Sequence, residues 1–507
     1  MIEPTELRRR HRRGRMTALI ERYVPALARF GTILCATAAL VSVIALMGYR
    51  LAYPYEIEWM EGGMLDHVRR VIAGKPLYVS PSLEFVPFIY PPGFYYVAAA
   101  VTRITGGEFL PLRLVSALSF FGVVALLVSF VYRETRDRDS AVISGGLFAA
   151  TFEIGGGWFD VGRVDMLFLL LIISAFYLLR FGLRPWAFIF AGMLLAAAFL
   201  TKQSAAVVAA PVVVWLALVQ WRMAVATIVA GGLTALAATA AVNESHGGWY
   251  LYYAFELPSG YTLWPERIVR FWTRDLIPTL PIALAIAIAY MCAPKAPKRG
   301  FYFSVAAGLL AGAWMSRAND GGYYNVLIPA HVALALLMGL GLSAWRPVIV
   351  ARLPARVAPA AWPYAIAITQ FLMLAYNPMD HLPRAPSSAA GDQLVATIRE
   401  TSGPVWVPFH PYLVEFAGKS GHAHWMAVSD ILRYGTPELR DRLRAEVNAV
   451  ISQRRYEKIV LSSNPFPDFP PIVGFYELER DLLYGDKKVF LPLTGSPRRP
   501  NKIYRSK

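Results

Sequence analysis

Long apolar runs separated by short polar connectors dominate the first three quarters of the chain. A helix needs about 20 mainly apolar residues to cross the hydrocarbon core of a bilayer, and about eleven stretches approach this length, some of them short enough to require tilt or re-entry. We therefore predict an α-helical polytopic membrane protein with about eleven transmembrane helices. The stretches occupy residues 29–51, 94–132, 140–154, 165–181, 186–200, 205–220, 224–243, 275–293, 301–315, 326–345 and 361–376.

The connectors between these runs alternate in charge. After the basic N-terminus, every second connector is rich in Lys and Arg, namely YRETRDRD, RFGLRP, QWR, APKAPKRG and WRPVIVARLPAR. Such connectors face the cytoplasm. The remaining connectors carry acidic, aromatic and glycine residues, so we place them on the outer face of the plasma (inner) membrane. This pattern predicts a cytoplasmic segment at residues 1–28 and, with an odd number of spans, a C-terminus outside.

Composition shifts after Tyr376. A polar linker, NPMDHLPRAPSSAAGDQ, is followed by two strand-like segments, PVWVPFH and KIVLSSN, and by a helical pattern in PELRDRLRAEVNAVISQRR. The predicted organisation is therefore a transmembrane domain at residues 29–376, with a long first external loop at 52–93, and a small external α/β domain at 381–507.

Overall composition supports a membrane protein. The chain is 56% hydrophobic and only 17% charged, far from the balance of a soluble domain. Its 50 Lys and Arg residues exceed its 34 Asp and Glu residues, but they cluster between apolar runs, which argues against nucleic acid as a partner. The two cysteines, Cys35 and Cys292, exclude a disulfide framework and a metal site built from cysteines.

The first external loop begins with an acidic cluster, YEIEWMEGG at residues 55–63. If a surface helix runs from Glu58 to Ala73, Glu58 and Glu61 share one face of it, and Leu65 and Val68 share the apolar side. A solvated loop is the alternative interpretation. A carboxylate at an apolar interface loses solvation, so its pKa rises and it becomes a better proton acceptor.

The stretch EWMEGGMLDHVRRVIAGKPLYVSPSLEFVPFIYPPGFYYV resembles the first external loop of the GT-C glycosyltransferases that use polyprenyl-phosphate sugars. This group includes protein O-mannosyltransferases, the lipid A aminoarabinose transferase and lipopolysaccharide galacturonosyl transferases. Glu58 and Glu61 fill the acidic pattern of the loop, with Glu58 where relatives commonly have Asp; GKPLY follows the helix, and Tyr90 begins the Y-P-P turn. The resemblance extends loosely over residues 29–376, through WFDVGRVDMLFLLL, TKQS and GGYYN.

This resemblance implies a hexosyl- or pentosyltransferase that moves a sugar from a polyprenyl phosphate to an acceptor hydroxyl on the outer face, with inversion. The acceptor is a glycan, a lipid or a protein. One carboxylate must act as general base, and Glu58 or Glu61 is the candidate. The phosphate leaving group needs cations, and Arg163, Lys202 and Arg317 are expected at the outer ends of spans, with snorkelling to lipid headgroups as the alternative role.

Further candidates are weaker. Asp160 and Asp165 flank Arg163, where they position it, help to bind a divalent cation or simply neutralise it. An aromatic-rich loop at 243–274 predicts an interfacial belt, although some of its residues are candidates for sugar contact. His410, His422 and His424 with Asp430 raise a metal site, but surface histidines are the favoured interpretation. The candidates for sugar or acceptor binding are Asp160, Asp165, Tyr90, His246, Glu256 and Asn325.

Two other functions share parts of this pattern. A lipid-linked-sugar transporter or flippase would also have many spans, but charges or Gly and Pro breaks are then expected near the bilayer centre. A glycan polymerase or ligase would share the outward site and its cations. The acidic pattern of the first loop favours transfer of a single sugar.

Overall fold

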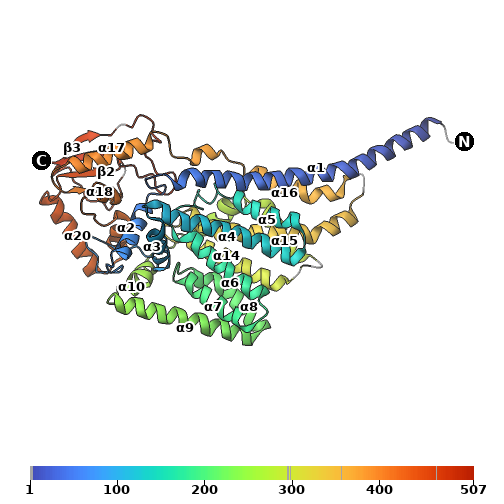
Figure 1. Ribbon diagram of the computed structural model, residues 1–507, viewed down its shortest axis with the longest axis horizontal. Helices are drawn as coiled ribbons and strands as arrows, with labels where there is room; N and C mark the ends of the chain where they lie inside the picture. Colours follow the sequence, from blue (N-terminus) through green and yellow to red (C-terminus); the bar gives the residue numbers. More distant parts are fainter. Residues whose placement is uncertain (1–3, 294–295, 297, 355–356, 464, 483) are drawn as a thin grey trace.

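A computed structural model of the chain describes residues 4–293, 296, 298–354, 357–463, 465–482 and 484–507, with side chains from Tyr23 onward. The side chains of RRRHRRGR and parts of APKAPKRG and WRPVIVARLPAR lie outside the described residues. The molecule is elongated. Helix α1 (Pro4–Leu51) projects beyond one end of a helical bundle, whereas a small sheet and the C-terminus lie at the opposite end (Figure 1).

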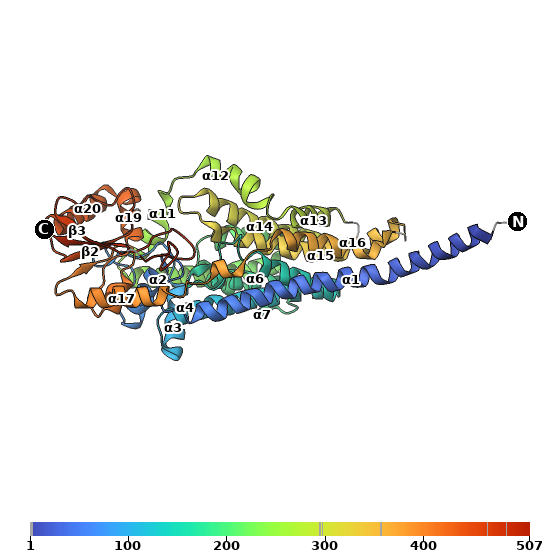
Figure 2. The same cartoon turned by 90° about the horizontal axis from the view of Figure 1, so that it is seen from above.

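Each predicted apolar run contains a helix, and these helices form the bundle. Seen from above, α1 runs along one side and α12 (Pro265–Arg270) lies on the other (Figure 2). Helix α15 (Ile328–Arg352) is central, with 89% of its apolar window buried, while the apolar window of α9 (Trp221–Ser245) is only 6% buried and α9 lies at the periphery. The other bundle helices are α4 (Phe109–Thr135), α5 (Arg138–Ala150), α6 (Val164–Phe181), α7 (Pro185–Phe199), α8 (Ala205–Val219), α13 (Pro281–Cys292), α14 (Arg299–Ala318) and α16 (Trp362–Met373).

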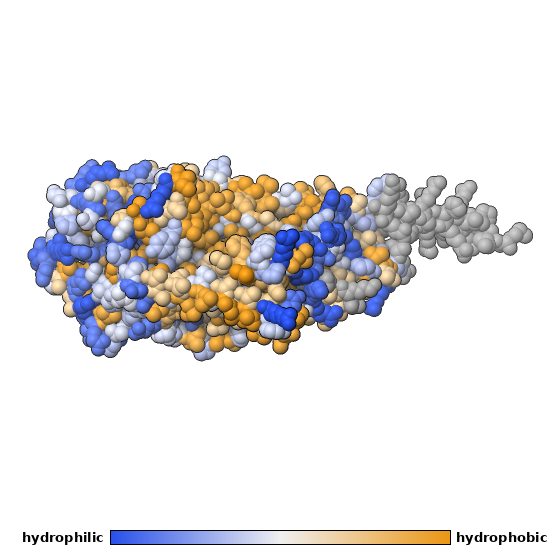
Figure 3. Space-filling view, turned by 60° about the horizontal axis from the view of Figure 1, so that its bottom comes forward, coloured by the Kyte–Doolittle hydropathy of each residue, from blue (hydrophilic) through white to orange (hydrophobic). Residues whose placement is uncertain are grey.

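Within the described residues, five helices are long and apolar enough to cross a membrane. A sixth span results if Pro265–Leu276 and Pro281–Cys292 are one segment bent by 98°, and α7 and α8 are apolar but shorter. Fewer helices therefore meet this criterion than the number of apolar runs, because several runs form helices too short to span alone. Figure 3 shows hydrophobic side chains over the middle of the molecule and hydrophilic side chains concentrated toward its ends.

Glycines set the closest helix contacts of the bundle. A Cβ at Gly308 of α14 would lie 2.1 Å from the carbonyl oxygen of Val208 in α8. A Cβ at Gly192 of α7 would lie 2.3 Å from the carbonyl oxygen of Thr227 in α9. Small residues are common where membrane helices pack because they let two backbones approach, so these positions fix which helices are neighbours.

The first loop leaves α1 and forms α2 (Glu61–Ile72), continues without regular structure, and enters α3 (Gly93–Thr105). Leu65 and Val68 are buried, as their predicted position on the apolar side requires. The predicted start of the helix is wrong, however. Glu58 precedes α2 and forms an isolated parallel β-bridge with Thr494, so Glu58 and Glu61 do not share a helix face.

The C-terminal region carries a four-stranded sheet in the order β1-β2-β4-β3. The strands β1 (Val405–Trp406) and β2 (Lys458–Leu461) are parallel, and β4 (Lys502–Ser506) pairs antiparallel with β2 and with β3 (Tyr476–Asp481). Both predicted strand segments and the predicted helix are present. The helices of this region are α17 (Ser387–Glu400), α18 (Tyr412–Phe416), α19 (Trp425–Tyr434) and α20 (Pro437–Ser452).

The first loop and the C-terminal region share one hydrophobic core. Met64 and Leu65 of α2 are buried in the same cluster as Tyr412 and Trp425. A Cβ at Gly62 would lie 2.2 Å from the Tyr412 ring, so α2 and α18 are in direct contact. The acidic loop is thus held between the helical bundle and the sheet.

Candidate active site

Glu58 lies between α1 and α2, and its side chain is only 1% exposed. Its Oε2 accepts a hydrogen bond of 2.6 Å from Arg163, which precedes α6. The other amino group of Arg163 donates to the hydroxyl of Tyr90 at 2.7 Å. Burial raises the pKa of Glu58 to about 7, although Arg163 opposes the shift. A pKa near neutrality suits a residue that must take up and release a proton.

Glu61 has a different environment although it is equally buried. Its carboxylate accepts two hydrogen bonds from Arg113, of 2.9 and 2.7 Å. It accepts two more, both of 2.8 Å, from the backbone N–H groups of Ile57 and Gly162. Burial alone would raise the pKa of Glu61, but Arg113 and the backbone donors outweigh it and hold the pKa below its usual value. Glu61 therefore joins three segments as a fixed anion.

A second cluster surrounds Asp165, in the first turn of α6. Its carboxylate accepts hydrogen bonds from Lys202 at 2.6 Å, from Asn325 at 3.1 Å and from the indole of Trp158 at 3.0 Å. Lys202 stays 14% exposed. The Trp158 ring also lies 5.6 Å from the guanidinium of Arg163, so this cluster is continuous with the one around Glu58.

Arg317, the third predicted cation, makes more hydrogen bonds than Lys202 does. It forms two hydrogen bonds with Asp275, of 2.7 and 3.2 Å, and donates to the carbonyl oxygen of Gly322 at 2.6 Å. Its guanidinium lies 5.2 Å from the Tyr324 ring. Arg317 thus anchors the GGYYN loop that carries Asn325.

Asp160 does not pair with Arg163. It forms an ion pair of 3.1 Å with Arg50 at the end of α1, and both side chains are buried. Burial raises the pKa of Asp160 against the effect of Arg50. Asp160 therefore ties the loop before α6 to α1, while Asp165 pairs with Lys202.

His410, His422 and His424 are buried, so their predicted surface placement is wrong. His410 contacts Glu56 through a short hydrogen bond. Burial raises the pKa of Glu56 and lowers that of His410 to about 3, because it penalises the charged form of each side chain. His422 and His424 bond to backbone groups, and Asp430 is also buried. The described residues contain no group of three or more side chains suited to a metal ion.

The two candidates in the aromatic-rich loop lie apart from these clusters. His246 bonds to the carbonyl oxygen of Val242 at 2.7 Å and packs against Tyr78 at 5.4 Å. Glu256 is exposed, at the end of the π-helix η1 (Tyr252–Glu256). Neither residue is bonded to Glu58, Glu61 or Asp165 in the described part of the chain.

A C-terminal segment that sequence reasoning missed closes over Glu58. The backbone N–H groups of Leu493 and Thr494 donate to the carbonyl oxygen of Ile57 at 2.8 and 3.3 Å. At Gly495, with φ of +80°, a Cβ would lie 2.6 Å from Oε1 of Glu58 and 2.4 Å from the ring of Trp59. Only glycine fits this position without strain, so the carboxylate and the segment are in direct contact.

Other site residues also escaped the sequence analysis. Arg50, Arg113 and Asp275 each form a buried ion pair in or beside the site. Arg113 had a detectable signal, because it lies within the apolar run at 94–132 and a charge inside such a run marks a functional or structural ion pair. The contact of Thr494 with Glu58 had none, since the two are joined only by tertiary folding.

Comparison with known proteins agrees with this architecture. Residues 90–244 match the family model of dolichyl-phosphate-mannose-protein mannosyltransferase, and no curated protein sequence matches the chain. The fold is similar to that of ArnT from Cupriavidus metallidurans bound to undecaprenyl phosphate, with 14% identity, 85% of this chain and 93% of that chain covered, and a TM-score of 0.58. Apo ArnT matches with 13% identity, 93% and 97% coverage and a TM-score of 0.60. The chain therefore has the fold of the GT-C glycosyltransferases, and the resemblance drawn from its first loop is confirmed.

Proposed function

We propose that the chain is an integral membrane glycosyltransferase that moves a sugar from a polyprenyl phosphate to an acceptor hydroxyl. The ArnT structure that shares its fold holds undecaprenyl phosphate, which supports a lipid-linked donor. The site lies at the end of the bundle opposite the projecting N-terminal helix (Figure 1). We place residues 1–28 in the cytoplasm and residues 381–507 outside the plasma (inner) membrane, so transfer takes place on the outer face.

One observation carries the assignment of the base. Glu58 and Glu61 are both buried, yet Glu58 has a pKa of about 7 and Glu61 has a pKa below its usual value. The hydrogen bonds of Glu58 within the described residues use Oε2 alone, which leaves Oε1 able to accept a proton. In Glu61, by contrast, each carboxylate oxygen already accepts two hydrogen bonds. Glu58 is therefore the general base, and Glu61 shapes the loop.

The proposed reaction is a single displacement. Glu58 removes the proton from the acceptor hydroxyl while that oxygen forms a bond to the anomeric carbon of the sugar. The bond from this carbon to the phosphate oxygen breaks, and polyprenyl phosphate leaves with the electron pair. Because protonation of Glu58 removes the counter-charge of Arg163, that arginine becomes available to stabilise the leaving phosphate as negative charge develops on it.

Lys202 is the principal donor-phosphate contact in this scheme. It is partly exposed and bonded to one carboxylate, whereas Arg317 is held by both oxygens of Asp275 and by a backbone carbonyl. Tyr90 and Asn325 are bonded to Arg163 and Asp165 respectively, which supports a role for their polar groups in sugar binding. His246 and Glu256 remain candidates for the acceptor side.

The test is to incubate purified protein with a panel of polyprenyl-phosphate hexoses and pentoses and to measure released polyprenyl phosphate, with and without Mg²⁺. We expect Glu58→Gln to lower turnover by at least about a hundredfold, the size of a lost general base. If Glu58→Gln keeps wild-type turnover with every active donor, Glu58 is not the base. Labelling with membrane-impermeant reagents tests the orientation separately, and a cytoplasmic 381–507 region would refute the placement of the site.

A further inference from the structure

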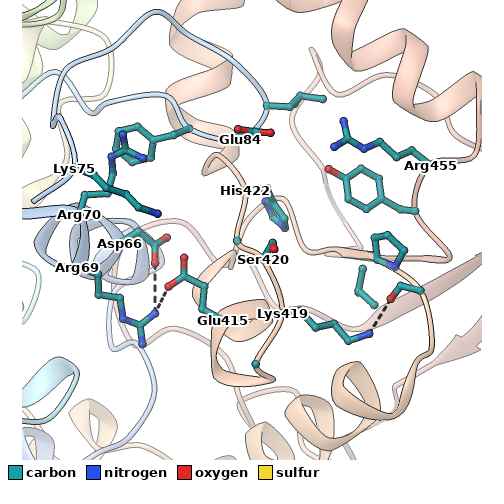
Figure 4. Close-up of a pocket in the computed structure, with 18 of the residues that line it drawn as sticks. Asp66, Arg69, Arg70, Lys75, Glu84, Glu415, Lys419, Ser420, His422 and Arg455 are labelled. Atoms are coloured by element: carbon teal, nitrogen blue, oxygen red, sulfur yellow. Dashed lines mark hydrogen bonds and ion pairs between the residues drawn. The ribbon is translucent and has the colours of Figure 1, made fainter. Parts of the chain in front are cut away.

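A large cavity lies between α2 and the C-terminal region, apart from the carboxylate site. Its volume is about 1050 Å³, just above the range of about 300–1,000 Å³ for small-molecule pockets. One wall comes from Asp66, Arg69 and Arg70 of α2, and the facing wall comes from Glu415, Lys419 and their neighbours (Figure 4). Because α2 begins at Glu61 and rises about 1.5 Å per residue, the cavity begins within two helical turns of the acidic loop.

The cavity carries more basic than acidic side chains, and most of its cations are not neutralised. Arg69 is paired with Glu415 and Glu108. In the described part of the chain, Lys75 and Arg455 bond to no carboxylate. Two further cations are bonded only to carbonyl oxygens, Arg70 to that of Pro76 and Lys419 to that of Gly403 among others. Four cations are thus available to an anionic ligand.

The acidic side chains of the cavity restrict which class of ligand it can bind. Asp66, Glu84 and Glu415 line the same space, and they would repel a compact ligand that presents only phosphate. Carboxylates accept hydrogen bonds from hydroxyl groups, whereas Arg and Lys bind carboxylate or phosphate groups. A ligand with many hydroxyls and a few acidic groups matches both sets.

We propose that this cavity binds an anionic saccharide, which under the proposed function is part of the acceptor. Only the role of the saccharide as acceptor rests on the proposed function, because binding itself needs no turnover. The saccharide lies along α2, so that its acidic groups meet Lys75 and Arg455 while a hydroxyl-bearing end extends toward the acidic cluster at residues 55–63.

Isothermal titration of the full-length protein in detergent tests the proposal, with trigalacturonic acid as probe and neutral maltotriose for comparison. We expect measurable binding of trigalacturonic acid, at least tenfold weaker binding of maltotriose, and at least tenfold weaker trigalacturonate binding by the double variant Lys75→Gln, Arg455→Gln. Both residues are exposed, so the fold should be retained. Arg444→Gln, an exposed cation of α20 outside the cavity, is the matched control and should bind normally.

The outcomes separate this proposal from the proposed function. Glu58→Gln should bind trigalacturonic acid as the wild type does, so a failed assignment of the base leaves the cavity proposal standing. Absent binding, equal affinity for maltotriose, or an unaffected double variant overturns the proposal. Loss of trigalacturonate binding when the protein is placed in nanodiscs of phosphatidylglycerol, but not of phosphatidylcholine, also overturns it, because the site then belongs to lipid headgroups.

Discussion

Folding shifts the pKa values of Glu58 and Glu61 in opposite directions, and this difference predicts effects on stability as well as on activity. Folding moves the pKa of Glu58 from 4.5 to about 7, and each pKa unit corresponds to about 1.4 kcal/mol, so the change corresponds to about 3 kcal/mol. The folded state binds this proton more tightly than the unfolded state does. The associated stability is therefore complete below pH 4.5 and is lost as the pH rises through about 7.

Glu58→Gln is neutral at every pH and escapes this loss. We expect it to unfold at the same temperature as the wild type near pH 4.5 and at a temperature several degrees higher at pH 8.5, where the difference reaches about 3 kcal/mol. The same substitution removes the base, so turnover falls at least about a hundredfold. In the wild type, turnover should rise with pH through about 7 as Glu58 loses its proton.

Glu61→Gln is the matched comparison, because its stability effect has the opposite sign. The pKa of Glu61 is lowered by folding, so its contribution is present above the usual value and is lost only as the pH falls. Replacing it breaks a buried pair with Arg113, and such losses typically cost about 3–5 kcal/mol. Glu61→Gln should therefore unfold at a lower temperature than the wild type at pH 8.5.

Thermal unfolding in one detergent, at one scan rate and across pH 4.5–8.5, checks both signs, and release of polyprenyl phosphate gives the activity. The reasoning is refuted if Glu58→Gln is destabilised at pH 8.5 as much as Glu61→Gln. That result would mean that Glu58 stabilises the fold as an ion-pair partner of Arg163. It would contradict the view that the charged carboxylate of Glu58 destabilises the fold and is retained for catalysis.

Two further predictions concern the donor phosphate and the C-terminal segment. Lys202→Gln should raise the KM for the lipid donor at least about tenfold, and adding Asp165→Asn should not restore it; restoration would mean that the lysine only neutralises Asp165. Gly495→Ala should lower kcat and shift its pH profile, because the φ of +80° and the contact with Glu58 exclude a Cβ. Gly474→Ala, with no atom within 4 Å of the added Cβ, is its control, and equal pH profiles for the two variants would show that the segment does not act on Glu58.

The pattern of the sequence predicted much of the fold. Apolar runs marked the bundle helices, and two strand-like segments marked β1 and β2. The number of helices able to span the membrane was harder to predict, because α7 and α8 are apolar but short, and the segments Pro265–Leu276 and Pro281–Cys292 meet at a bend of 98° that hydropathy does not register. Helix length depends on where the backbone turns, and composition constrains that weakly.

The site was predicted less evenly. The acidic loop and the cations Arg163 and Lys202 could be chosen as candidates, because charges beside apolar runs stand out, and the structure pairs these cations with Glu58 and Asp165. Their partners could not be identified, since Arg163 lies 105 residues from Glu58 and Arg113 lies 52 residues from Glu61. Pairing over such separations is decided by helix packing, and no local periodicity encodes it.

The difference between two glutamates three residues apart follows from backbone geometry. Glu61 is the first residue of α2, so its side chain folds back to the free N–H of Ile57 and reaches that of Gly162. Glu58 lies three residues earlier, in a β-bridge with Thr494, and within the described residues its carboxylate accepts a hydrogen bond from Arg163 but from no backbone N–H group. Burial then acts on Glu58 with one arginine to oppose it and on Glu61 with an arginine and two amides. The start of a single helix thus decides which carboxylate is a fixed anion and which is free to exchange a proton near neutral pH.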